Sequence, residues 1–150
     1  MDVFEEIVAA ATRESRLWGT AAIPSHEREL VAVFSELAPP EFELGVETVY
    51  EAYLVHYGRP RLFAPAGESE RILLGDYLYA HGLVHIAQAG GVEAVATMAD
   101  LISHCAAMRA VGGDGDGDAW VVAARSLGGA PESAAVEQAL ARHLARVAVG

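Results

Sequence analysis

The sequence contains no lysine. All ten basic residues are arginines, and they stand against 21 aspartates and glutamates, which gives a formal net charge of −11. Nucleic acids and anionic membrane surfaces are bound largely through Lys and Arg side chains that neutralise phosphate charges. An acidic chain without lysine is therefore predicted not to bind nucleic acid.

Cysteines and long apolar runs are also scarce. Cys105 is the single cysteine, so no internal disulfide forms, and such usage is typical of a reducing compartment. The longest stretch without a charged residue, 77–92, has 16 residues, two histidines and a Gly-Gly pair, which makes it too short and too polar to span a bilayer. Asp2, Glu5 and Glu6 give the N-terminus the wrong charge for a signal peptide. We therefore expect a cytoplasmic protein.

Apolar residues, by contrast, are abundant. They make up 53% of 150 residues, a length that corresponds to one domain and buries roughly two thirds of the unfolded surface without a disulfide or metal. We therefore expect a single domain over residues 1–150. Such a high apolar content also favours an oligomer, because some of this surface is available for a partner.

The spacing of apolar residues predicts helices throughout the chain. Residues 46–57 also suit a strand, but no convincing second strand pairs with them, so a helix is favoured. Residues 68–88 are apolar nearly all round, which predicts a helix in the middle of a bundle. A loop is expected at 58–67 and a flexible, solvated acidic loop at 112–118. The expected helices cover 2–18, 25–38, 46–57, 68–88, 92–110, 119–127 and 132–147. The predicted fold is an all-α helical bundle.

Three motifs resemble, in order, those of trans-polyprenyl diphosphate synthases. LLGDYLYAHGL at 73–83 is similar to the GD(F/Y)L helix of that family, and HYGRP at 56–60 is similar to its RRGxP loop with both arginines replaced. ETVYE at 47–51 stands where the family's spacing puts its first aspartate-rich motif, DDxxD. The similarity covers roughly residues 40–147 and implies the N-terminal half of the isoprenoid synthase fold.

The departures from the family pattern imply that the chain has no catalytic residues of its own. The family holds Mg²⁺ on two aspartate clusters, and the metal stabilises charge on the leaving diphosphate. Here only Glu47 and Glu51 remain, as a vestigial metal and diphosphate motif. The arginine pair that would clamp a diphosphate is missing, and no lysine replaces it. We therefore expect no metal or cofactor in this chain.

Within the family, the chain resembles the non-catalytic small subunit of heterodimeric synthases of the hexaprenyl and heptaprenyl type, some of which make menaquinone side chains. This resemblance implies a catalytic large subunit as partner, which holds the Mg²⁺, and a small subunit that stabilises it and helps set product length. Residues of the GD helix would then line a tunnel or an interface, namely Gly75, Asp76, Tyr77 and Tyr79. The alternative is a free-standing helical homo-oligomer that binds an apolar ligand or regulates another protein on an inherited fold.

Other candidate residues have simpler interpretations. His81 and His85 are four residues apart, as in helical metal sites, and His104 is the nearest candidate for a third ligand, but buried or partner-facing histidines are favoured. A metal-dependent enzyme on these histidines is a third, weaker hypothesis. Cys105 has apolar neighbours at helical spacing and is predicted to be a packed thiol.

Overall fold

The protein is all-helical, as predicted. The computed structural model describes residues 1–147, and within them the only β contact is an isolated bridge between Ala22 and Phe63. No described helix is long and apolar enough to cross a membrane. The α-helices are α1 (Val3–Glu14), α2 (Arg16–Ala21), α3 (Glu43–Tyr57), α4 (Glu68–Ala110), α5 (Gly117–Ser126) and α6 (Ser133–Val147). Short 3₁₀ turns are η1 (Ser25–Glu27), η2 (Ser35–Leu37) and η3 (Pro40–Phe42).

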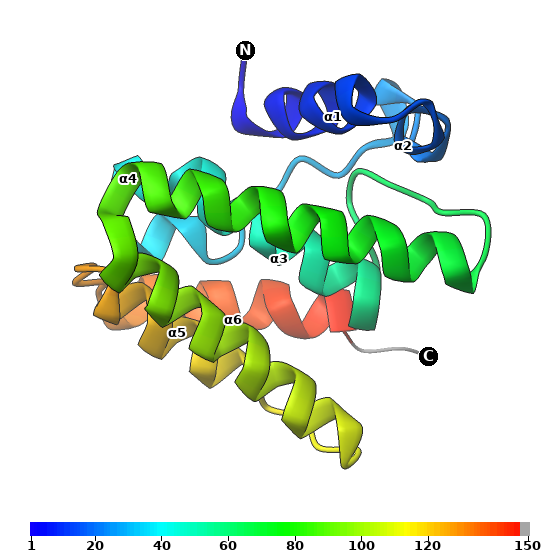
Figure 1. Ribbon diagram of the computed structural model, residues 1–150. Helices are drawn as coiled ribbons and strands as arrows, with labels where there is room; N and C mark the ends of the chain where they lie inside the picture. The colour runs from blue at the N-terminus through cyan, green and yellow to red at the C-terminus, as the bar shows by residue number, and fades with distance from the viewer. Residues whose placement is uncertain (148–150) are drawn as a thin grey trace.

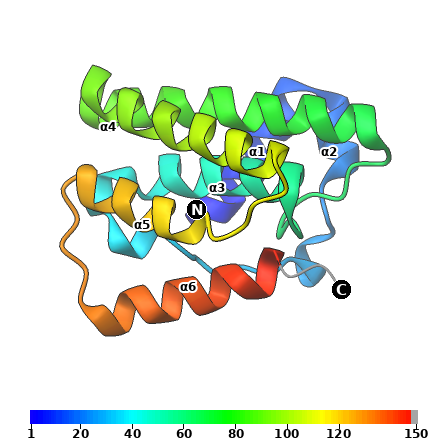
Figure 2. The same cartoon turned by 90° about the horizontal axis from the view of Figure 1, so that it is seen from below.

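Helix α3 is the centre of the molecule. Every residue from Gly45 to Val55 is buried, and α3 lies between α4 on one side and α6 on the other (Figure 2). Helices α1 and α2 lie together at one end of the molecule (Figure 1). The prediction that residues 68–88 occupy the middle of the bundle is wrong. Helix α4 buries one face, but Leu73 on its other face is 57% exposed and Val84 is 52% exposed.

Two glycines allow α3 and α4 to pack closely. A Cβ on Gly82 of α4 would lie 2.6 Å from Val49 Cγ2 and 3.1 Å from Val49 N. From the other side, a Cβ on Gly45 of α3 would lie 2.5 Å from Ile86 Cδ1 and 3.2 Å from Ile86 N. Because both contacts include backbone atoms, any side chain at either position would push the two helices apart.

The predicted break at the Gly-Gly pair is confirmed as a sharp bend within α4. Gly91 has φ 70° and ψ −159°, a conformation that glycine adopts without the steric cost of a Cβ. The part of α4 after this residue turns away from the first part and runs alongside α5 (Figure 1). The core consequently has two clusters, one between α1, α2, α3 and the start of α4, the other between α3, α5, α6 and the rest of α4.

The N-terminal helix is confirmed in its first turns and shorter than predicted. Asp2 caps it, since its Oδ1 accepts from the N–H of Glu5 at 2.8 Å, and its apolar residues Phe4, Ile7, Val8 and Ala11 are buried. The helix ends before Ser15, whose Oγ accepts from the N–H of Leu17 at 3.1 Å and so begins α2. A side chain that caps a new helix at this point explains why residues 2–18 are not one continuous helix.

The predicted helix at 25–38 is wrong. The segment is extended between the two short turns η1 and η2, and Leu30 and Val31 are 48% and 46% exposed. Its backbone groups bond to distant parts of the chain instead. The N–H of Glu29 donates to the carbonyl of Arg61 at 3.3 Å, and the carbonyl of Ala32 accepts from Arg142 of α6 at 3.0 Å. These tertiary bonds replace the helical ones that the local pattern favours.

Candidate functional site

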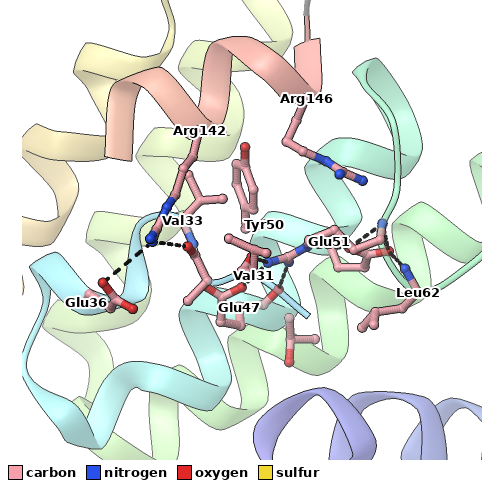
Figure 3. A network of polar contacts seen from close by, with 12 residues as sticks. Val31, Val33, Glu36, Glu47, Tyr50, Glu51, Leu62, Arg142 and Arg146 are labelled. Atoms are coloured by element: carbon pink, nitrogen blue, oxygen red, sulfur yellow. Dashed lines mark hydrogen bonds and ion pairs between the residues drawn. The ribbon is translucent and has the colours of Figure 1, made fainter. Parts of the chain in front are cut away.

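The two glutamates of ETVYE point into the interior. Glu47 and Glu51 are one turn apart on α3, and both side chains are fully buried. The structure places the guanidinium of Arg61, from the loop after α3, against both of them. Arg61 Nη1 lies 2.5 Å from Glu47 Oε2, and Arg61 Nε lies 3.0 Å from Glu51 Oε1. Figure 3 shows the two glutamates turned toward this shared interior space.

Backbone N–H groups satisfy the remaining oxygens of the pair. Glu47 Oε1 accepts from the N–H of Val33 at 3.3 Å. Glu51 Oε2 accepts from the N–H of Arg61 at 3.1 Å and of Leu62 at 2.9 Å. Charged groups removed from water are tolerated only when they are paired and hydrogen-bonded in this way.

Arg61 itself is 1% exposed and is held on every side. Its Nη1 also donates to the carbonyl of Val31 at 2.9 Å, and its guanidinium lies 5.2 Å and 5.1 Å from the ring centroids of Phe4 and Tyr50. Burial disfavours the charged form, but the two glutamates outweigh burial and raise the pKa of Arg61 above its ordinary value. The arginine therefore stays charged inside the core.

These residues do not fit the Mg²⁺ ion that the synthase family holds at its first aspartate-rich motif. Mg²⁺ demands octahedral oxygen ligation and usually keeps several of its waters. Around Glu47 and Glu51 the space is instead filled by a guanidinium, by backbone N–H groups and by aromatic rings. The lone pairs that would face a metal already accept hydrogen bonds from protein donors.

The GD-helix residues belong to α4 and lie against a different part of α3, near His56. Gly75 is so close to the imidazole of His56 that a Cβ there would collide with the ring. Asp76 is exposed, and its Oδ1 lies 3.3 Å from His56 Nε2 without hydrogen-bond geometry. Burial lowers the pKa of His56, although Asp76 opposes this shift. Tyr79 stacks on the same imidazole, with ring centroids 5.1 Å apart.

Tyr77 lies on the opposite side of α4 from this group. Its ring stacks between those of Trp18 and His81, at centroid distances of 6.3 Å and 5.5 Å. The structure thus gathers Gly75, Asp76 and Tyr79 around His56 and leaves Tyr77 beside α2. In the described hydrogen bonds, Glu47 and Glu51 receive nothing from the GD helix.

A second buried network, centred on Asp116, has no signal in the sequence. Asp116 is 1% exposed, so the prediction of a solvated loop fails at this residue, while Asp114 and Asp118 are exposed. Tyr53 of α3 donates to Asp116, Arg109 donates to it at 3.1 Å and 3.2 Å, and His143 Nε2 lies 3.4 Å away. Alternating Asp and Gly residues look alike in the sequence, and only the fold selects which aspartate turns inward.

These partners decide the charge of Asp116. Burial alone would raise the pKa of the carboxyl group, but hydrogen bonds from His143, Arg109 and Tyr53 outweigh it and lower the pKa below its ordinary value. The network continues to Tyr50, whose hydroxyl lies 2.8 Å from His143 Nδ1. It therefore joins α3, α4, α6 and the 111–116 loop through one buried negative charge.

A pocket of about 460 Å³ opens beside this network. Its charged lining includes three aspartates and a single arginine, Arg109, and its apolar wall includes Leu140 and Leu144. Asp116 already neutralises Arg109, so Asp114 and Asp118 give the pocket an excess of negative charge. Such a lining repels a diphosphate.

The histidine candidates do not come together as a metal centre. His81 and His85 are adjacent, with ring centroids 4.6 Å apart, whereas His104 lies beyond the bend of α4 in a groove beside α5. Among residues 1–147, no group of three or more His, Cys, Asp or Glu side chains is placed to hold a metal ion. Cys105 is a buried free thiol, as predicted, and burial raises its pKa to about 12.

Comparison with known proteins adds no relative. No protein-family model, curated protein or solved structure matches this chain.

Proposed function

We propose that this chain is a non-catalytic subunit of a heterodimeric trans-prenyl diphosphate synthase. In this proposal it packs against a catalytic subunit in the cytoplasm, stabilises that subunit and helps set the length of the prenyl product. The catalytic subunit supplies the Mg²⁺ and the diphosphate-binding residues. The all-α fold and the motif resemblance support this proposal, and an exposed surface on α4 carries it.

That surface is an apolar stripe, which we call the α4 seam. It consists of Leu73, Tyr77, Ala80, Val84 and Ala87. These residues follow one another at alternating intervals of four and three, the spacing by which one helix packs along another in a coiled coil. They span 15 residues, a rise of about 21 Å along the helix.

Except at Tyr77, which stacks on Trp18 of α2, the α4 seam faces solvent in the isolated chain. Leu73 and Val84 are 57% and 52% exposed, Ala80 and Ala87 are exposed, and Tyr77 is half-buried. A continuous apolar stripe on a soluble domain is typical of an interaction surface. Because it lies on the GD helix, the region that resembles the synthase family is also the region that offers a surface for a partner.

The arginines support a role without catalysis. Two arginines lie in the loop after α3. Arg61 is fully engaged with Glu47 and Glu51. Arg59 is exposed, and its Nη2 lies 3.9 Å from Glu29 Oε2. A diphosphate requires several convergent cations or a metal. A single exposed arginine beside a carboxylate does not meet this requirement.

The second candidate is a homo-oligomer. The same seam pairs two copies of this chain if its apolar residues are self-complementary, and the product is then a symmetric dimer without a synthase. The two candidates differ in whether the pure chain is already a stable oligomer or acquires its stable form only with a synthase.

The experiment begins with the tagged chain in its native lysate. Proteins that co-purify are identified, and any DDxxD-bearing synthase among them is purified separately and recombined with the chain. We expect polyprenyl diphosphate synthesis from the recombined pair, with a product length that differs from that of the synthase alone, and no synthesis by the pure chain. Activity of the pure chain contradicts the proposal. A stable homodimer that leaves synthase activity unchanged favours the second candidate.

A further inference from the structure

We infer that Arg61 is the resident cation of the ETVYE motif, so that Glu47 and Glu51 form a guanidinium-binding site that the chain fills with its own arginine. Where the resemblance would place a divalent metal, the fold places a covalently attached organic cation. This inference concerns the isolated chain and is independent of the proposed function.

The geometry of the site matches a guanidinium. Nε donates to Glu51, and Nη1 donates both to Glu47 and to the carbonyl of Val31. The Nη2 group lies 3.4 Å from the carbonyl oxygen of Glu47. A planar fork of N–H donors suits two carboxylates held on successive turns of a helix, and no lysine or spherical ion reproduces it.

The charges leave no place for a metal in addition to the arginine. Two carboxylates and one guanidinium carry a net charge of −1, and a divalent ion at the same carboxylates would lie beside the fixed positive charge. In a fully buried site this repulsion is weakly screened. Binding a metal would therefore require Arg61 to leave the interior, which would also break its bonds to the backbone.

The same site fastens three separate segments. The glutamates belong to α3, Val31 and Val33 belong to the extended segment after η1, and Arg61 and Leu62 belong to the loop before α4. The motif thus holds that segment and the loop against the central helix. This explains why two acidic residues are buried in a chain that lacks the other ligands of the family.

The first test removes the arginine side chain and supplies the cation from solution. In Arg61→Ala, the melting temperature should fall by about 10 °C, because a charged group loses its buried partner. About 50 mM guanidinium, far below the molar concentrations that denature proteins, should recover a large part of this loss. The same concentration of urea or NaCl should not. Arg59→Ala, in the same loop but exposed, is the control and should change little in any of these solutions. Recovery with Mg²⁺ but not with guanidinium would overturn the inference.

The second test uses the unaltered chain. Mn²⁺, a paramagnetic substitute for Mg²⁺, should leave the side-chain NMR signals of Glu47 and Glu51 sharp, and Mg²⁺ should not raise the melting temperature. Selective broadening of these two signals by Mn²⁺ would show a metal site and overturn the inference.

A third comparison applies if Arg61→Ala does not fold. Arg61→Met is compared with the triple variant Arg61→Met, Glu47→Gln, Glu51→Gln, in which the site is neutral. If the glutamates serve to bind the arginine, the triple variant should melt well above Arg61→Met. An equal or lower melting temperature of the triple variant would overturn the inference.

Discussion

Asp116 and the Glu47–Glu51 pair illustrate how contacts set the role of an individual acidic residue. All three side chains are buried, and each is bonded to an arginine and to further donors. Buried charges in such networks make the surrounding fold depend on their protonation state.

Asp116→Asn should destabilise the protein at neutral pH by about 3 kcal/mol, since it removes the charge that faces Arg109 in a buried network. The pKa of Asp116 is lowered from its ordinary value of 3.8. Its stabilising contribution is thus present above about pH 4 and is lost as the pH falls below that value. The difference in unfolding free energy between the two proteins, measured by urea denaturation, should narrow from pH 7 to pH 2.5.

The matched control for this prediction is Asp114→Asn. Asp114 is exposed in the same loop, so its substitution should change the unfolding free energy by no more than about 0.5 kcal/mol at any pH tested. If the difference in unfolding free energy between wild type and Asp116→Asn stays constant from pH 7 to pH 2.5, the assigned network is contradicted.

Cys105 should be almost unreactive in the folded protein. Its thiol is 1% exposed, and burial raises its pKa to about 12. At pH 8 the thiolate fraction is then about 10³-fold smaller than for an ordinary thiol of pKa near 9, before any steric protection is considered. Labelling with a disulfide reagent should be slow in buffer and fast in denaturing urea. The control is Ser103→Cys, at an exposed position of the same helix, where the new cysteine should be labelled rapidly in buffer. Fast labelling of the wild-type protein in buffer would contradict the buried position of Cys105.

At the scale of single residues, the sequence identified only part of the candidate site. The resemblance selected Glu47 and Glu51 as a pair, but Arg61 lies ten residues further along, in a loop, and no local pattern links it to the glutamates. Asp116 was indistinguishable from Asp114 for the same reason. Contacts between side chains that are far apart in the sequence depend on how the helices and loops pack together, and a local pattern does not contain this information.

At the scale of elements, the helices whose apolar faces pack on one another were predicted well. The helices at 46–57, 92–110 and 132–147 correspond to α3, the second part of α4 and α6. The prediction of a helix at 25–38 failed because apolar spacing is a local signal, whereas the bonds from Val33 to Glu47 and from Arg61 to Val31 join distant parts of the chain. Tertiary bonds to buried charges outweighed the helix propensity of a short segment.

Gly82→Ala should be clearly destabilising, because its new methyl group would meet both the side chain and the backbone nitrogen of Val49. A helix backbone cannot yield as a flexible side chain does, so we expect a loss of about 2 kcal/mol, measured by urea denaturation. Gly67→Ala is the control, since nothing lies within 4 Å of its added Cβ and its φ of −155° suits any residue. Equal stability of both variants would mean that α3 and α4 are not in close contact at Gly82.

At the scale of the whole molecule, the position of α4 connects the fold with the proposed function. Residues 68–88 are apolar nearly all round, which predicted a central helix, but α3 occupies the centre and α4 lies against one side of it. On the face away from α3, Tyr77 packs on Trp18 of α2, whereas Leu73 and Val84 stay exposed. An apolar face left open in this way is covered when a second molecule binds to it. Helix α4 thus carries part of the exposed apolar surface, at Ile72, Leu73 and Val84.

The α4 seam is tested by placing a charge in it. Leu73→Asp and Val84→Asp should each weaken binding to the proposed synthase partner by roughly 30-fold or more, since an unpaired charge would be buried in the interface. Val122→Asp on α5 and Leu144→Asp on α6 are matched controls, because those residues are 60% and 61% exposed on other surfaces, and they should leave affinity nearly unchanged. All four variants should unfold at nearly the wild-type urea concentration, which separates a lost interface from a damaged fold.

If instead the pure chain is a dimer by light scattering and only the seam variants become monomers, the seam pairs two copies of this chain. Should the seam variants behave like the controls in both measurements, the partner surface lies elsewhere, and the observation that carries the proposed function is lost.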